Sequence, residues 1–538
     1  MMKSGSGMLT RNKNILKKHS NKTDKQLKIV TAIVTIYFSI VVYLSVWSTL
    51  KYLFLFPLII LFIFCLFKKF TKSANEFVIP ISEKDNDKSQ LLFFITVFCV
   101  IFAGQILYWL AYYPGGFNLD ALGQWDQVHS NMQLNDWHPV FTTACYWLIT
   151  RVYDNFAFCI FVQLLLFSFS VAFLLLRIYR LKVSPMLLIF IALYIAINPA
   201  VGMNNVCLFK DVPFTIALVW MSIIIINLIE SKGIWLKSLL HLYYIIIDLL
   251  IVTLTRHNGI FCVVPLIICI AVLYRRKIKR VVSIIIVYSI MLSLIQGPVY
   301  AFFSVEKHSN VTGEAVGIPM AIMANSYLND YDNTPQNVKS FVTSVADKKE
   351  WKENYVLGEW DSCKWNFGGT DLFKDEPLSK FVKMTISTTV ASPETTYQSL
   401  RENTRVVWQI FGYSNWDTWV YIEDNDYGII ANHNPVCSHI ADCILRFSLT
   451  SVGSFLFWNI GAANALFMIL ILLVVARKES SKLVYCFPFV CYNLLTMLLL
   501  CGPSHRYFYF NSVLALPVMT VMLKENYCLR KDSKVEFQ

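Results

Sequence analysis

The sequence predicts an all-α polytopic membrane protein with about 12 transmembrane helices. Hydrophobic residues make up 56% of the 538 residues, and charged residues only 15%. A soluble chain of this size normally carries about 25% charged residues. Uncharged apolar runs near the ~20 residues that a membrane span needs recur along the chain. Together these observations exclude an ordinary soluble globular protein.

The chain begins with a basic segment, residues 1–28, which holds eight Lys or Arg side chains and one acid. The apolar run behind it is too long for a signal-peptide core, so we interpret it as a retained first span with a cytoplasmic tail on anionic lipid. The segment 140–153 is apolar but short and is interpreted as an interfacial helix. Twelve candidate spans follow in order: 29–48, 51–67, 91–112, 156–176, 185–200, 212–229, 238–254, 259–274, 281–303, 449–476, 483–501 and 507–523.

Basic clusters in the connections between spans predict the orientation. With the N-terminus inside, every even-numbered connection carries Lys or Arg clusters, and the tail 524–538 is also inside. The odd connections then lie outside, including the loop 113–155 and a large segment, 304–448, inserted before the last three spans (449–523). This segment has a net charge of −7, so the rest of the chain, out of a total of +12, carries +19. Turn signals such as Gly313 predict a folded extracytoplasmic domain there.

The first long outer loop carries the strongest site candidate, Asp120. Asn118 can cap a helix that places Asp120 in its first turn. Spacings of three and four put Asp120, Gln124 and Gln127 on one face and Leu119, Leu122, Trp125, Val128 and Met132 on the other. We expect an interfacial amphipathic helix with Asp120 facing away from lipid. The alternative is that Asp120 only complements the helix dipole.

Other polar residues emerge at span ends on the same predicted side: Asp136, His138, Lys210-Asp211, Arg256-His257-Asn258 and Ser504-His505-Arg506. Charges at span ends are costly unless they are paired or used. His138 could be a general base, a phosphate ligand or a plain interfacial histidine. A local ion pair is the alternative for Lys210-Asp211, and snorkelling to head groups is the alternative for Arg256. Cationic positions facing a carboxylate loop suggest a phosphate-linked substrate.

The segments "PGGFNLDALGQWDQ", "DWHP", "KDVPF", "RHNG" and "HRY" resemble those of a little-characterised bacterial multi-spanning family placed near the GT-C superfamily of integral-membrane glycosyltransferases. The resemblance covers roughly residues 91–523, with a GT-C-like core at 91–303 and two extra spans at 29–67. It implies transfer of a sugar from a polyprenyl-phosphate carrier to an extracytoplasmic glycan, lipid or protein acceptor at the cell membrane. Nucleic acid is not an expected partner.

Carried over by position, the resemblance makes Asp120 the catalytic base, with Asp136 and His138 as further catalytic candidates. Arg256 and Arg506, helped by Lys210, His257 or His505, would hold the donor phosphate. Asp120 is followed by Ala121, so the paired acidic motif of many members is missing. No metal ligand is assigned, no cofactor is certain, and a divalent cation stays open.

Two other function classes stay open. Twelve spans with both termini inside also describe a transporter or flippase, which would place charges in mid-span, as at Asp248. A non-catalytic scaffold would tolerate loss of Asp120 and Arg256 together. No CxxC or Cys/His spacing predicts a zinc site, and a Cys437–Cys443 disulfide is left as an alternative to two thiols.

Overall fold

The computed structural model describes residues 5–80, 87–306, 316–368, 373, 376–412 and 416–525. All regular elements within these ranges are helical, which confirms the all-α prediction for this part of the chain. Gly313, residues 1–4 of the basic tail and residues 526–538 of the C-terminal tail lie outside the described residues. The rest of the predicted N-terminal tail continues the first apolar run as one helix, α1 (Gly5–Val46).

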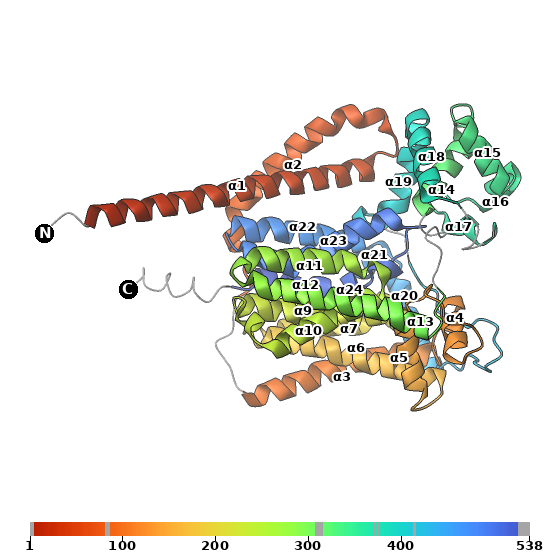
Figure 1. Cartoon of the computed structure of the whole chain (residues 1–538), viewed down its shortest axis with the longest axis horizontal. Coiled ribbons are helices and arrows are strands. Elements are labelled where there is room, and N and C mark those ends of the chain that lie inside the picture. The colour runs from red at the N-terminus through yellow and green to blue at the C-terminus, as the bar shows by residue number, and fades with distance from the viewer. Residues whose placement is uncertain are drawn as a thin grey trace.

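The bundle is built from α1 and the following apolar helices (Figure 1): α2 (Phe56–Phe70), α3 (Asp87–Ala111), α6 (Phe156–Tyr179), α7 (Pro185–Ile197), α8 (Pro199–Asn205), α9 (Asp211–Glu230), α10 (Leu239–Thr255), α11 (Ile260–Leu273), α12 (Ile278–Leu294), α13 (Tyr300–Phe302), α20 (Pro435–Ser448), α21 (Ser451–Phe457), α22 (Ile460–Ala476), α23 (Phe487–Thr496) and α24 (Phe510–Leu523). Short helical turns join them: η1 (Leu50–Leu55), η2 (Thr71–Glu76), η3 (Ile234–Lys237), η4 (His257–Gly259), η5 (Arg275–Lys277), η6 (Ile295–Val299), η8 (Ser480–Tyr485), η9 (Met497–Leu499) and η10 (Arg506–Phe508).

Six helical stretches of the described chain are long and apolar enough to cross a membrane, and two bent helix pairs would raise the number to eight. This indicates a membrane protein, but the predicted number of twelve spans is not confirmed. The apolar stretches predicted at 238–254 and 259–274 form helices of 17 residues or fewer, shorter than the ~20 residues of a typical span.

The apolar helices divide into an inner and an outer group. The apolar windows of α6 and α9 are 67% and 72% buried within the protein, whereas that of Leu50–Glu76 is 6% buried. Phe54 and Leu58 on this outer stretch are 71% and 63% exposed. Large exposed apolar surfaces of this kind suit contact with lipid tails.

The predicted span 449–476 is wrong as a single helix. The chain breaks after α21, and Asn459 starts α22 by accepting a hydrogen bond from Ala462 N at 2.7 Å. The same side chain donates to Ile410 O at 2.5 Å. An asparagine that satisfies two main-chain groups favours a new helix start over a continuous helix. Before the break, α20 packs along α3, and Ser438 Oγ donates to Ala111 O.

A second apolar core lies outside the bundle, in a unit that we call the cap (residues 316–391), at the right of Figure 1. It contains α14 (Gly317–Asn329), α15 (Gln336–Val345), α16 (Lys348–Asn354), α17 (Asp361–Lys364) and α18 (Leu378–Ala391). Cys501, from the loop before η10, is part of this core. The next helix, α19 (Pro393–Trp408), packs on α14 and on α22, so it joins the cap to the bundle.

The connections rich in Lys and Arg gather at the end of the bundle away from the cap (Figure 1). Lys524 Nζ lies 3.0 Å from both Glu230 carboxylate oxygens, and Arg477 Nη2 lies 2.9 Å from Glu479 Oε2. Lys482 completes this group, which we call the terminal-end network (Glu230, Arg477, Glu479, Lys482 and Lys524). The loops predicted to be extracytoplasmic, with α4 (Leu119–Val128) and the cap, lie at the opposite end.

Candidate active site

The loop before α4 (Leu119–Val128) is fixed by main-chain hydrogen bonds on both sides. Gly116 N donates to Val206 O, and Phe117 N donates to Tyr421 O, both at 2.9 Å. A Cβ on Gly116 would lie 2.4 Å from Cys207 Sγ, so only glycine allows this close approach. The loop therefore delivers the start of α4 to a defined place between two distant chain segments.

Asn118 caps α4 as predicted, because its side chain accepts a hydrogen bond from Ala121 N at 3.1 Å. The predicted division of the helix faces is partly wrong. Gln124 is fully buried, donates to Leu208 O and accepts from Thr142 Oγ1. Leu119, predicted on the apolar face, is 63% exposed. Amide side chains turn inward here because they pair with polar groups of the adjacent segments.

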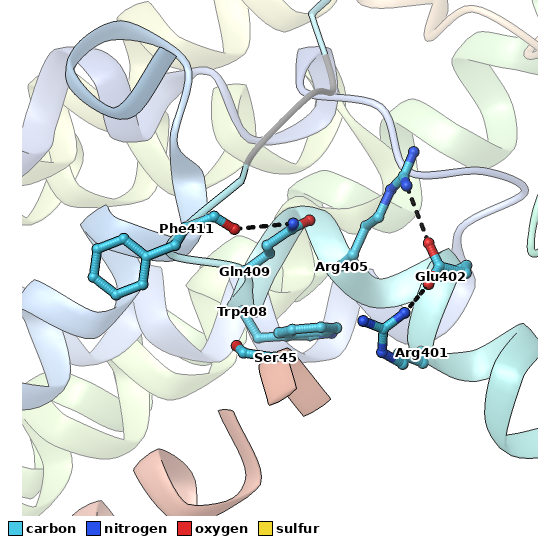
Figure 2. Close-up of a pocket in the computed structure, with 7 residues that line it drawn as sticks. All are labelled: Ser45, Arg401, Glu402, Arg405, Trp408, Gln409 and Phe411. Carbon is cyan, nitrogen blue, oxygen red and sulfur yellow. Dashed lines mark hydrogen bonds and ion pairs between the residues drawn. The ribbon is translucent and has the colours of Figure 1, made fainter. Parts of the chain in front are cut away.

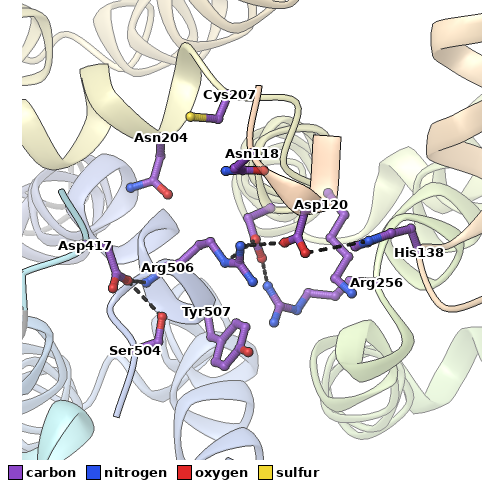
Figure 3. Close-up of polar contacts among 12 residues, drawn as sticks. Asn118, Asp120, His138, Asn204, Cys207, Arg256, Asp417, Ser504, Arg506 and Tyr507 are labelled. Atoms are coloured by element: carbon purple, nitrogen blue, oxygen red, sulfur yellow. Dashed lines mark hydrogen bonds and ion pairs between the residues drawn. The ribbon is translucent and has the colours of Figure 1, made fainter. Parts of the chain in front are cut away.

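Asp120 forms an ion pair with Arg506 from the last outer loop (Figure 3). Arg506 Nη1 donates to Asp120 Oδ2 at 2.6 Å, and His138 Nε2 lies 3.7 Å from Asp120 Oδ1. The Arg506 guanidinium also lies over the Phe209 ring, 4.5 Å from its centre. The side chains of Asp120 and Arg506 are 30% and 23% exposed, so this pair reaches the surface.

Asp211 and Arg256 form a second pair that is buried. Their side chains are in ion-pair contact and only 2% and 7% exposed. Asp211 is the first residue of α9, and its other carboxylate oxygen lies 3.5 Å from Arg506 Nε. The Arg256 guanidinium lies 4.8 Å from the centre of the Tyr507 ring. Asp120, Arg506, Asp211 and Arg256 thus form a chain of alternating charges, which we call the ion cluster.

Asp417 fixes the loop that carries Arg506. Its carboxylate accepts hydrogen bonds from the Arg506 main-chain N at 2.5 Å and from Ser504 Oγ at 2.8 Å (Figure 3). Burial raises the pKa of Asp417, and these hydrogen bonds oppose that effect without cancelling it. No motif around Asp417 pointed to this role, because the partners lie 87 and 89 residues away in sequence.

The charges around Asp120 control its protonation. Burial raises its pKa, but the charges of Arg506, His138 and Lys210 outweigh burial and hold the pKa well below its usual range. Burial lowers the pKa of Arg506, but the Asp120 carboxylate more than reverses this, so the pKa lies above its usual value. Both groups are therefore charged at neutral pH.

The predicted residues Asp136, His257 and Lys210 lie on the flank of the ion cluster. His257 Nε2 lies 3.1 Å from Asp136 O, and Tyr300 OH donates to Asp136 Oδ1 at 3.3 Å. Lys210 Nζ lies 3.5 Å from Trp137 O. Burial lowers the pKa of His257, and the Asp136 charge acts against this effect. Asp211, for which a local pair with Lys210 was the alternative, forms ion pairs with Arg256 and Arg506.

His505 lies on the other side of the Arg506 loop. It is fully buried, with its ring 5.2 Å from the Trp458 ring and Nε2 3.5 Å from Ser512 Oγ. Burial lowers the pKa of His505 to about 3. A neutral imidazole offers a phosphate no charge, so Arg506 is the stronger candidate of this predicted pair for binding a phosphate.

The cap brings one more cation to the site, Lys364 of α17. Its ammonium lies 2.8 Å from Asp361 Oδ1 and 6.0 Å from the centre of the Trp137 ring. Trp360 N donates to Cys501 O at 2.7 Å, so α17 adjoins the chain that leads to Arg506. The sequence carries no signal for this contact, because Lys364 and Trp137 lie in distant parts of the chain.

The structure also tests the alternative of a Cys437–Cys443 disulfide and shows whether side chains gather that could hold a metal ion. Cys437 and Cys443 are both thiols, so the alternative of a disulfide is wrong. Both residues lie on α20, and six residues of helix separate their Cα atoms by about 9 Å along the axis, beyond the ~7 Å limit for a disulfide. Within the described ranges, no group of three or more His, Cys, Asp or Glu side chains could hold a metal ion.

A pocket of about 60 Å³ is lined by residues outside the ion cluster (Figure 2). Arg401 and Arg405 of α19 both contact Glu402 there, and Arg405 Nη1 donates to its carboxylate at 3.0 Å. Glu359 adds a second carboxylate at 3.9 Å from Arg405. Two carboxylates balance the two guanidinium charges of the pocket. The ion cluster also holds two carboxylates and two guanidinium groups, but the Lys210 charge acts on it as well, so it is the better candidate for an anionic ligand.

The ion cluster combines a deprotonated carboxylate that reaches the surface with two arginines and an adjacent lysine and histidine. Such a group can accept a proton and can stabilise negative charge on a ligand. No family model, curated protein or solved structure matches this chain.

Proposed function

We propose that the protein is a membrane glycosyltransferase of the GT-C type, which moves a sugar from a polyprenyl-phosphate carrier to an extracytoplasmic glycan, lipid or protein. The observation that supports it most is the contact between Asp120 and Arg506 at 2.6 Å. In this contact a carboxylate lies beside a guanidinium at the cap end of a bundle of apolar helices, which supports roles as proton acceptor and as phosphate ligand. A lipid-linked donor needs both groups at such a place.

The reaction we propose is a single displacement. The acceptor hydroxyl oxygen attacks the anomeric carbon, the bond from this carbon to the phosphate oxygen breaks, and its electron pair leaves with polyprenyl phosphate. The hydroxyl proton passes to the Asp120 carboxylate, which is ionised at neutral pH because its pKa is low. The anomeric configuration is inverted.

Arg506 is the proposed main ligand of the donor phosphate, and Lys210 adds a charge on the same side. A guanidinium presents a planar pair of donors to phosphate oxygens and stabilises the charge that develops on the leaving group. Arg256 is too buried, at 7% exposure, to contact a phosphate in this arrangement. We assign it to holding Asp211, which in turn positions Arg506.

The proposed location is the cell membrane, with both termini cytoplasmic and the cap outside. The gathering of basic connections at the end opposite Asp120 supports this orientation, because cytoplasmic loops are enriched in Lys and Arg.

The test is Asp120→Asn, which keeps the side-chain shape and removes the proton acceptor. We expect sugar transfer to fall by about 10²- to 10⁴-fold, measured with a radiolabelled polyprenyl-phosphate sugar. The matched control is Asp126→Asn, because Asp126 lies on the same helix and accepts a hydrogen bond from Tyr427 instead of an arginine. Thermal unfolding verifies that both variants are folded. Full activity of Asp120→Asn would exclude the mechanism.

A transporter or flippase is the alternative function. It is favoured by Asp248, which is buried within α10 at 6% exposure. Buried ionisable residues inside membrane helices often belong to ion pathways. Uptake of a polar solute into vesicles, driven by an ion gradient and lost in Asp248→Asn, would support this alternative over glycosyl transfer.

A further inference from the structure

The two ion pairs of the ion cluster differ in how easily a ligand can open them. The pair of Asp211 and Arg256 is almost fully buried, whereas Asp120 and Arg506 are 30% and 23% exposed. Breaking a buried pair leaves an uncompensated charge, but the partner of a partly exposed pair can be replaced by another ligand at lower cost. An incoming anion will therefore act on the partly exposed pair of Asp120 and Arg506.

Arg506 keeps its position when Asp120 leaves it. Its Nε lies 3.5 Å from Asp211, its guanidinium lies over the Phe209 ring, and its main-chain N is held by Asp417. These contacts do not involve Nη1, the atom bound to Asp120. Nη1 is therefore a donor that can change partner while the rest of the arginine stays fixed.

We infer that the phosphate group of a bound polyprenyl-phosphate ligand, either the sugar-linked donor or the free monophosphate, takes the place of the Asp120 carboxylate on Arg506, so that Asp120 acts as an internal competitor for the phosphate site. The choice of ligand rests on the proposed function. In the displaced state, the His138 ring still adjoins Asp120, at 3.7 Å in the present arrangement.

The exchange would link donor binding to base strength. While Arg506 holds Asp120, the carboxylate is a weak proton acceptor. Once Nη1 of Arg506 donates to the phosphate instead, Asp120 loses its strongest cationic partner and becomes a stronger base. The carboxylate would then be ready to accept a proton only when a donor is present.

The inference is tested by direct binding of a short-chain polyprenyl monophosphate, without sugar, to the full chain in detergent micelles. Asp120→Asn is expected to bind this ligand about tenfold more tightly than the wild type, because the competing charge is gone. Asp126→Asn should bind like the wild type. The gain should vanish when Arg506→Gln is added to Asp120→Asn, which shows that competition takes place at Arg506. Inorganic phosphate is titrated in parallel, and a gain with either ligand supports the exchange.

Equal or weaker binding of the polyprenyl phosphate and of inorganic phosphate by folded Asp120→Asn would overturn the inference. If that variant does not fold, amide hydrogen exchange of the wild type decides. Saturation with polyprenyl phosphate should speed amide hydrogen exchange in residues 121–125, because α4 loses its contact with Arg506. Unchanged or slower hydrogen exchange in these residues would overturn the inference that phosphate replaces Asp120 on Arg506. The proposed function is judged separately by sugar transfer, so tighter binding without any transfer by the wild type would reject the glycosyltransferase and keep the phosphate exchange.

Discussion

The two ends of the helical bundle both hold networks of charged side chains, but these networks are tied to the protein differently. In the terminal-end network, Lys482 Nζ donates to the main-chain oxygens of Met522 and Lys524, at 3.3 and 2.8 Å, as well as contacting Glu479. In the ion cluster, the Arg506 guanidinium contacts carboxylates and an aromatic ring. The main-chain hydrogen bonds of Lys482 tie the terminal-end network to the backbone. The side-chain contacts of the Arg506 guanidinium leave room for the partner exchange that we propose.

The largest effect on the difference between the two charge networks is expected for Asp211→Ala, at the cap end. It leaves the buried Arg256 without its carboxylate, and we expect a loss of about 3–5 kcal/mol of unfolding free energy. Thermal unfolding in detergent measures this effect. Replacing both partners, Asp211→Leu with Arg256→Met, should restore most of the stability while transfer stays low. If Asp211→Ala were as stable as the wild type, the ion cluster would not be held by this buried pair.

Acid should weaken the cap end of the bundle through His505. Its pKa is about 3 in the folded protein, so the unfolded chain binds more protons between about pH 3 and 6.5. Stability is therefore lost as the pH falls through this range, by roughly 2–3 kcal/mol between pH 6.5 and 4.5. Unfolding curves at several pH values should show a flatter dependence for His505→Asn. An identical dependence in this variant would show that other groups cause the loss.

The smallest effect is expected at the opposite end, for Glu230→Ala. This change removes the acceptor of Lys524 Nζ and of Tyr485 OH, and should cost about 1–2 kcal/mol of unfolding free energy. Transfer per folded molecule should not change, because the terminal-end network has no part in the proposed reaction. The measurement combines thermal unfolding with transfer corrected for folded protein. A loss of transfer at full stability would mean that the two ends are coupled.

The sequence could predict the groups of the candidate site that lie at span ends. Asp120, His138 and Arg506 come from loops that the basic connections assign to one side, and the structure brings these side chains together. Charge asymmetry between connections reports the side of the membrane because it acts on each loop independently. This asymmetry does not indicate which charged side chains form ion pairs with one another.

The remaining features depend on packing that no local pattern encodes. Asp211 could be read only as a neighbour of Lys210, because its arginine partners are distant in the chain. Asp417 and Lys364 are contributed by segments without a recognisable motif. Gln124 is oriented inward because it donates a hydrogen bond to the carbonyl group of Leu208. A hydropathy pattern cannot predict such a hydrogen bond. The break at Asn459 leaves no mark in the hydropathy of the sequence, because the runs on both sides of it are apolar.

Distance along the chain gives the contact between Asp120 and Arg506 a consequence for biosynthesis. The two residues are 386 positions apart, and Arg506 precedes only the last helix of the bundle, α24. At ~5–20 residues per second, a ribosome needs roughly 20–80 s to reach Arg506 after it has made Asp120. Until then the carboxylate lacks this partner, and the candidate site is incomplete. A nascent or truncated chain would therefore carry the acid but not the arginine, which restricts the proposed activity to chains whose synthesis is nearly finished.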